Sequence, residues 1–69
     1  MSVMQIVVNG EARQLPQATR LQALIDQLAL GERRVAVEIN GEIIPRSRWA
    51  ERPLADGDRV ELIHAVGGG

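Results

Sequence analysis

The chain of 69 residues contains no cysteine and no lysine, and its only aromatic side chain is a single tryptophan. The lack of cysteine excludes a disulfide scaffold, a thiolate zinc site and a cysteine nucleophile. Without lysine there is no side-chain amine to form a Schiff base or to accept an isopeptide bond. Because Phe and Tyr are absent as well, the core must be built from aliphatic side chains.

The chain is close to neutral. Eight basic and nine acidic residues give a formal net charge of −1, without the basic stripe that nucleic-acid and membrane-surface binders normally carry. No apolar run approaches the ~20 residues that span a bilayer, and the first residues do not resemble a signal peptide. We therefore expect a cytoplasmic protein with neither a nucleic-acid nor a membrane partner.

Alternating apolar residues predict the strands, and Asn-Gly pairs predict the turns between them. The dipeptide occurs at positions 9–10 and 40–41, and it tolerates positive φ at both central positions of a type I′ hairpin turn. Asp56-Gly57-Asp58 is a further turn. The expected strands cover residues 4–8, 11–15, 35–39, 43–44 and 59–63.

One helix is predicted from Thr19 onward. Thr19 and Gln22 have the spacing of a capping box, in which each side chain bonds the backbone N–H of the other residue. Gly31 is placed where a left-handed C-terminal cap is needed. An apolar stripe facing the core follows from the helical spacing of Leu21, Leu24, Ile25 and Leu28.

The order of these elements predicts the fold class. A helix with one apolar stripe covers one sheet face, and a right-handed crossover sets the last strand parallel to the first. We expect an α+β fold of the β-grasp (ubiquitin-like) type, a mixed sheet of four to five strands curled over one helix. This domain would comprise residues 1–63, with 64–69 as a flexible C-terminal tail. A ferredoxin-like α+β sandwich is the alternative, but residues 46–55 are too short to supply its second helix.

Few side chains could carry out catalysis. His64 is the only histidine, and a Ser–His–acid set is improbable because both serines lie outside the predicted strands. Asp56, Asp58 and Glu61 could hold a hard cation, although acids that merely solvate a loop are the simpler interpretation. We therefore expect no catalytic residues of the chain's own and no metal site.

Three arginines gather around the tryptophan. Arg46, Arg48 and Arg52 lie close to Trp49 in the sequence, and both residue types are enriched at the energetic centres of interfaces. We expect Trp49 to fill the open end of the core. The arginines either form a docking patch or simply face water. His64, where the last strand gives way to the tail, could also meet a partner.

The chain ends on Gly67, Gly68 and Gly69. A glycine run is usually a flexible linker or a frayed end. Without Cβ, however, the backbone can approach another surface closely, and a terminal glycine offers a carboxylate with no side chain beside it. The glycines alone leave both an inert end and a reactive end open.

Several segments, taken together, are similar to one known family. They are Met4-Gln5-Ile6, Leu21-Gln22-Ala23-Leu24-Ile25, Val37-Glu38-Ile39-Asn40-Gly41, Ile44-Pro45-Arg46-Ser47-Arg48-Trp49, Asp56-Gly57-Asp58 and Gly68-Gly69. With these segments the chain resembles the ThiS family, the small sulfur carrier proteins of thiamine (thiazole) biosynthesis. The Pro-Arg-x-x-Trp stretch and the diglycine end are its most specific parts. Three residues precede Met4, so the natural start is either Met1 or Met4.

The resemblance implies that Gly69 is the modified residue. An adenylating (E1-like) partner would use ATP to convert the Gly69 carboxylate into an acyl-adenylate, and a sulfur donor protein would then convert it into a thiocarboxylate. Thiazole synthase would receive this sulfur, while Gly67 and Gly68 let the tail enter the partners' sites. The carrier would be a protein co-substrate and not an enzyme, with no cofactor of its own.

Two other functions remain open. A sulfur carrier for another pathway, such as molybdopterin synthesis, would share the fold and the tail. A ubiquitin-like interaction module would share only the fold, since its C-terminus would be inert.

Overall fold

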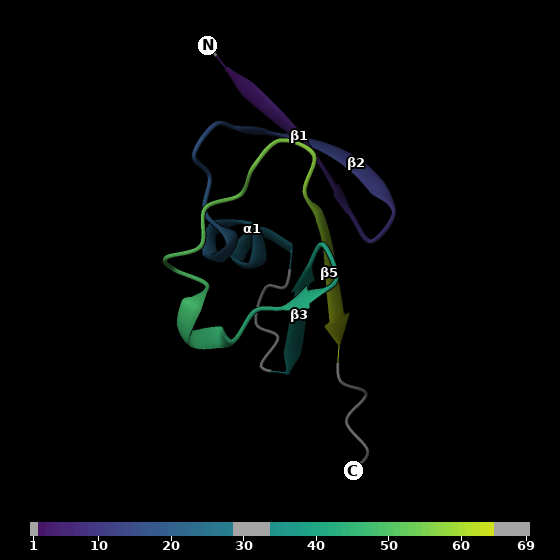
Figure 1. Ribbon diagram of the computed structural model, residues 1–69, viewed down its shortest axis with the longest axis vertical. Coiled ribbons are helices and arrows are strands. Elements are labelled where there is room, and N and C mark those ends of the chain that lie inside the picture. Colours follow the sequence, from purple (N-terminus) through teal and green to yellow (C-terminus); the bar gives the residue numbers. More distant parts are fainter. Residues whose placement is uncertain (1, 29–33, 65–69) are drawn as a thin grey trace.

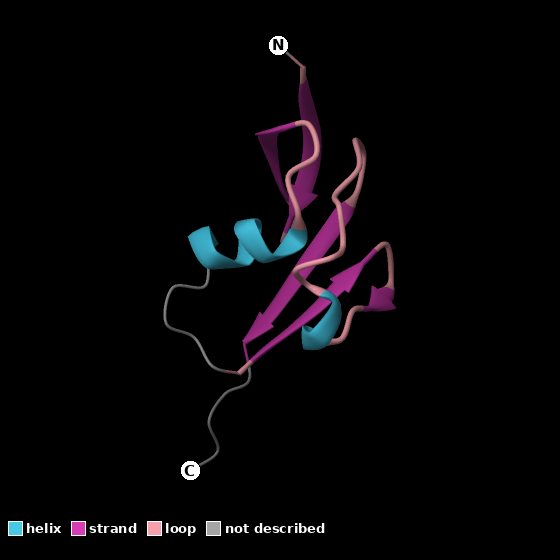
Figure 2. Cartoon of the chain, turned by 90° about the vertical axis from the view of Figure 1, so that its left-hand side faces the viewer, coloured by secondary structure: helices cyan, strands magenta, loops and turns pink. Residues whose placement is uncertain are grey.

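The computed structural model describes residues 2–28 and 34–64 as a five-stranded mixed sheet with one α-helix on one of its faces (Figures 1 and 2). The strand order is β2-β1-β5-β3-β4. Within these residues there is no second α-helix of the kind that a ferredoxin-like sandwich needs. The elements are β1 (Val3–Val8), β2 (Glu11–Pro16), α1 (Leu21–Leu28), β3 (Val35–Ile39), β4 (Glu42–Ile43), the 3-10 helix η1 (Arg46–Arg48) and β5 (Arg59–His64).

The last strand, β5, lies in the middle of the sheet. It pairs in parallel with β1, with Val8 opposite Val60. On its other side it pairs antiparallel with β3, from Val35 opposite His64 to Ile39 opposite Val60. Figure 1 shows β1 and β5 running in the same direction. The predicted parallel pairing of the last strand with the first is therefore confirmed, as is the β-grasp topology.

Both Asn-Gly turns adopt the predicted backbone. The φ angles are 50° and 84° at Asn9 and Gly10, and 53° and 85° at Asn40 and Gly41, as a type I′ turn requires. The Asn9 side chain has a further role, because its Oδ1 accepts a hydrogen bond of 2.9 Å from the Leu62 N–H. The first hairpin is thus tied to the central strand.

The helix begins at Leu21, and the predicted capping box is wrong. The Thr19 hydroxyl donates to the Pro16 carbonyl at 2.7 Å and does not accept from the helix. The Gln22 side chain donates to the Asp26 carboxylate at 2.9 Å, one turn further along the helix. Neither side chain is therefore engaged in capping.

Backbone carbonyls from a distant segment cap the helix instead. The Leu21 N–H donates to the Arg52 carbonyl at 2.8 Å, and the Gln22 N–H donates to the Trp49 carbonyl at 3.0 Å. These are among the first N–H groups of the helix, which have no partner within it. The segment around residues 49–52 and the helix therefore hold each other in place. The predicted C-cap, Gly31, lies outside the described residues.

The core lies between α1 and the sheet and is aliphatic except for Trp49. The tryptophan is only 3% exposed, and its Nε1–H donates to the Ile44 carbonyl at 3.0 Å. The prediction that Trp49 fills the end of the core is confirmed. The other buried apolar residues are Met4, Ile6, Val8, Leu15, Leu21, Leu24, Ile25, Val37, Ile39, Ile44, Leu54, Val60 and Leu62.

No helix in the described part of the chain is long and apolar enough to cross a membrane.

Candidate functional site

The chain leaves the sheet at the C-terminal end of β5. This strand runs through His64, one residue beyond the predicted end at Ile63, and His64 is exposed. The inward residues of β5 are Val60 and Leu62, which are buried in the core. The chain segment that leads to Gly69 thus begins at a strand that is paired with a neighbouring strand on each side. Residues 65–69, which include the three glycines of the predicted tail, lie outside the described residues.

The loop before β5 is fixed by two carboxylates. Asp56 accepts a hydrogen bond of 2.7 Å from the Gln5 N–H. Asp58 accepts from the Ala55 N–H at 2.9 Å and from the Asn40 side-chain amide at 3.1 Å. Only 7% of Asp58 is exposed. The interpretation that these acids merely solvate a loop is therefore wrong for Asp56 and Asp58, and the buried Asp58 organises the turn into β5.

The metal-site alternative finds no support in this arrangement. Asp56 and Asp58 bind backbone and side-chain N–H groups, whereas Glu61 lies further along, on β5. Within residues 2–28 and 34–64, no three His, Asp or Glu side chains come close enough to hold a metal ion.

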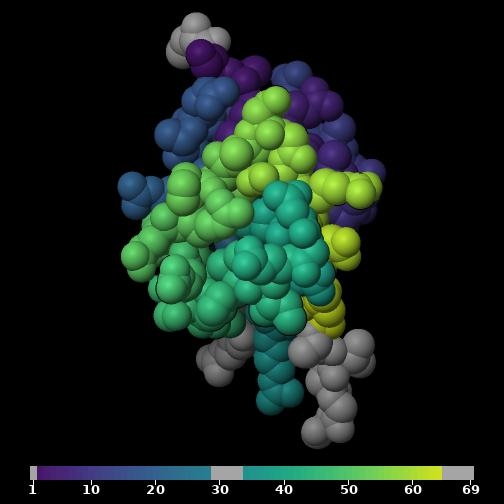
Figure 3. Space-filling model, in the orientation of Figure 1, coloured from purple at the N-terminus to yellow at the C-terminus, as the bar shows by residue number. Residues whose placement is uncertain are grey.

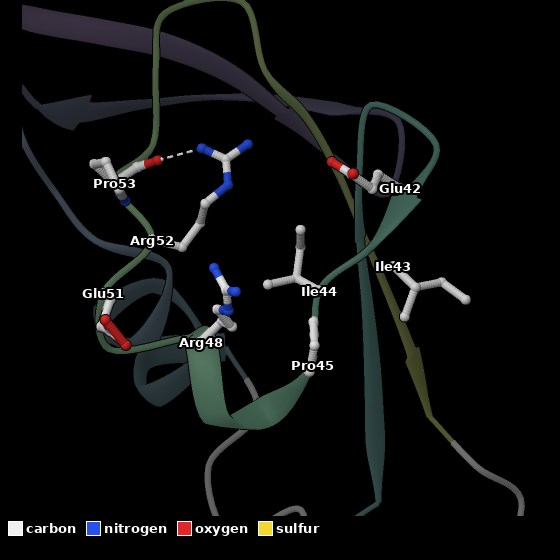
Figure 4. A pocket seen from close by; sticks show the side chains of 8 residues that line it. All are labelled: Glu42, Ile43, Ile44, Pro45, Arg48, Glu51, Arg52 and Pro53. Carbon is white, nitrogen blue, oxygen red and sulfur yellow. Dashed lines mark hydrogen bonds between the residues drawn. The ribbon is translucent and has the colours of Figure 1, made fainter.

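The arginines around Trp49 divide into two groups. Arg46 stacks over the Trp49 ring, with its guanidinium carbon 4.8 Å from the ring centroid, a distance at which a cation is attracted to the ring face. Arg48 and Arg52 instead line a hollow of about 380 Å³ (Figure 4). The three arginines therefore do not form one common patch. Arg46 covers the tryptophan, whereas Arg48 and Arg52 border an open space where a partner could bind.

Comparison with known proteins identifies the family. The ThiS family model matches residues 6–69. The chain belongs to the ThiS family. The match includes the β5 strand and continues through the three C-terminal glycines, so it covers both the folded body and the predicted reactive end. The resemblance found in the sequence is thereby confirmed.

Individual ThiS relatives and a thiazole synthase are also similar. The sulfur carrier protein ThiS of Escherichia coli K12 is 35% identical over 66 residues, which make up 96% of this chain and 100% of that protein. A thiazole synthase of Paramagnetospirillum magneticum is 41% identical over 66 residues, again 96% of this chain but only 20% of that protein. The chain therefore spans about a fifth of the length of that relative.

A solved ThiS structure has the same fold. The crystal structure of the thiamine biosynthesis protein ThiS from Geobacter metallireducens superposes with a TM-score of 0.80 at 30% sequence identity. The match covers 96% of this chain and 100% of that chain. The β-grasp assignment thus agrees with an experimental structure from the same family.

Proposed function

We propose that this chain is a sulfur carrier whose Gly69 carboxylate becomes a thiocarboxylate and supplies sulfur for thiazole formation in thiamine biosynthesis. The observation that carries this proposal is the ThiS family match, which extends to Gly69. The Escherichia coli relative named as a sulfur carrier aligns over its whole length, which supports the same function.

The proposed chemistry has two stages. A carboxylate is a poor electrophile, so an oxygen of the Gly69 carboxylate first attacks the α-phosphorus of ATP on an adenylating partner, and pyrophosphate leaves. A persulfide sulfur of a donor protein then attacks the acyl carbon, and AMP leaves. Cleavage of the resulting sulfur–sulfur bond by a thiol releases the thiocarboxylate on Gly69. In this scheme Gly67 and Gly68 give the backbone the clearance that a narrow partner site demands.

The carrier acts as a protein co-substrate in this proposal and not as an enzyme. The partners provide the catalytic groups and consume the ATP, and the folded body provides recognition. The cytoplasm is the proposed location of this cycle. Thiazole synthase is proposed as the sulfur acceptor, a role supported by the relatives of that name in which a ThiS-like segment forms about a fifth of the chain.

Intact-mass spectrometry tests the proposal. The full chain is incubated with the adenylating enzyme, the donor protein in its persulfide form and a thiol that cleaves the acyl disulfide, with and without ATP. We expect an ATP-dependent mass increase equal to the replacement of one oxygen by sulfur, which fragmentation assigns to Gly69. Thiazole synthase and molybdopterin synthase are then compared as acceptors of this sulfur. An unchanged mass with an adenylating enzyme that is active on another carrier would contradict the proposal and favour an inert interaction module.

A further inference from the structure

The hollow beside β4 is a surface feature that the sulfur chemistry does not use. One wall is formed by β4 and Pro45, and the other by residues 48–53, as Figure 4 shows. In the space-filling view these two segments lie next to each other on the face turned to the viewer, in teal and green (Figure 3). The lining residues are Glu42, Ile43, Ile44, Pro45, Arg48, Glu51, Arg52 and Pro53.

Hydrogen bonds hold the two walls of the hollow in place. The Trp49 side chain donates to the Ile44 carbonyl at 3.0 Å and so links one wall to the other. The second wall is fixed to the start of the helix, because the Leu54 N–H donates to the Thr19 carbonyl at 2.9 Å and the Arg52 carbonyl caps α1. A preformed site of this kind loses little conformational entropy when a partner binds.

Two positive charges enter the hollow. The Arg48 and Arg52 side chains extend into it from the same wall (Figure 4). Arg52 donates one hydrogen bond to the Pro53 carbonyl at 2.8 Å, which leaves most of its five N–H donors for other acceptors. Neither guanidinium forms an ion pair with a residue that the structure describes. The ion pair found among those residues joins Arg13 to Glu11 at 4.0 Å.

The acids on the rim do not neutralise these charges. The Glu42 carboxylate faces the arginines from the other wall without reaching them, and the Glu51 carboxylate points away (Figure 4). Apolar surface completes the lining, since Ile44 and two prolines border the hollow. Ile43, at the rim, is 68% exposed. A complementary ligand therefore carries a carboxylate for the guanidiniums, which bind it in a bidentate geometry, beside an aliphatic group.

We propose that the hollow between β4 and residues 48–53 docks an acidic, partly apolar segment of thiazole synthase, in which an Asp or Glu side chain pairs with Arg48 and Arg52. The inference rests on the proposed function, because that function makes thiazole synthase a partner. The ThiS-like segments within thiazole synthase relatives indicate that the two proteins work in contact. The apolar lining favours a protein segment over a nucleotide phosphate.

Charge reversal tests the docking site. The dissociation constant for thiazole synthase from the same genome is measured by titration calorimetry with the full chain. We expect the Arg48→Glu, Arg52→Glu double variant to bind at least about tenfold more weakly. Arg13→Glu is the control for the single variants Arg48→Glu and Arg52→Glu, which change the net charge by the same amount. Arg13 lies on β2 at the opposite edge of the sheet, and we expect its variant to bind like the unmodified chain. Equal binding by the double variant and the control would overturn the proposal.

Two further measurements keep the result specific. If the double variant melts at a lower temperature, the Arg48→Gln, Arg52→Gln variant replaces it. We then expect binding to depend less on salt concentration than it does for the unmodified chain. ATP and AMP are titrated alone. A nucleotide that binds the unmodified chain but not the variant would overturn the assignment to a protein segment.

The mass assay separates this proposal from the proposed function. We expect the double variant to acquire sulfur on Gly69 as the unmodified chain does, because its C-terminus is intact. If the unmodified chain acquires no sulfur, the proposed function fails, while the binding comparison still decides whether the arginines dock thiazole synthase. If only the double variant fails to acquire sulfur, the hollow serves the adenylating enzyme, and the proposal for thiazole synthase is overturned.

Discussion

At the scale of single residues, the two asparagines of the hairpin turns each combine a backbone conformation with a long-range hydrogen bond. Asn9 accepts from the Leu62 N–H. Asn40 accepts from the Arg59 N–H at 3.0 Å and donates to the Asp58 carboxylate at 3.1 Å. Asparagine tolerates positive φ better than most residues with a side chain, and glycine, which tolerates it best, has no side chain to make these bonds. Both turns therefore hold the strand that leads to the C-terminus.

Replacing Asn9 tests this double role. In Asn9→Gly the turn keeps its backbone, but the Leu62 N–H loses its acceptor and the unfolded chain gains freedom, so we expect a loss of roughly 1 to 2 kcal/mol in unfolding free energy. Urea denaturation measures the change. Asn9→Asp retains the acceptor oxygen and should be clearly more stable than Asn9→Gly. Equal stability of the two variants would show that the hydrogen bond contributes nothing.

At the scale of elements, the helix and the segment at residues 49–54 depend on each other. The helix supplies N–H groups whose acceptors are the Trp49 and Arg52 carbonyls. The segment follows η1 and contains no helix or strand of its own, so these bonds and the buried Trp49 fix its path. This arrangement gives the hollow its second wall and sets the positions of Arg48 and Arg52.

The apolar face of the helix is open to a direct test. Leu24 is 1% exposed, and Leu24→Ala should lower the unfolding free energy by about 2 to 5 kcal/mol through lost burial and a cavity. Gln27 on the same helix is exposed, so Gln27→Ala is the control and should stay within ~0.5 kcal/mol of the unmodified chain. Chemical denaturation of the three proteins side by side measures both changes. A small effect at Leu24 would mean that the helix packs by another face.

The elements were predictable from the sequence because their signals are local. The alternation in residues 35–39 and the Asn-Gly pairs mark strands and turns within a few residues. The cap of the helix was not predictable, because its acceptors lie about 30 residues further along the chain. The spacing of Thr19 and Gln22 matched a capping box, but tertiary contacts supplied the acceptors. Asp58 shows the same limit, since its burial depends on the neighbouring turn at Asn40.

At the scale of the whole molecule, the folded core and the proposed reactive end are separate parts of the chain. The buried residues of the described structure lie between Met4 and Leu62, whereas the proposed chemistry takes place at Gly69. The fold was predictable from the order of the elements. The role of Gly69 was accessible only through the resemblance to a family, because a glycine run by itself fits an inert end equally well.

Deletion of Gly69 tests this separation. We expect no thiocarboxylate to form on the shortened chain, because the adenylating site would meet a carboxylate displaced by one residue. The thermal midpoint should move by less than about 4 °C, the shift that corresponds to ~1 kcal/mol in a domain of this size. Circular dichroism and the mass assay measure the two quantities on the same sample. A large fall in the midpoint would show that the terminal glycine contributes to folding.

The central position of β5 has a mechanical consequence. A force applied at the C-terminus reaches the folded body through β5, and β5 is hydrogen-bonded to β1 on one side and β3 on the other. Force along this axis loads both ladders in shear, so their bonds must break together and not one after another. Under the proposed function, this pairing on both sides would keep the fold intact while a partner enzyme binds the C-terminal end.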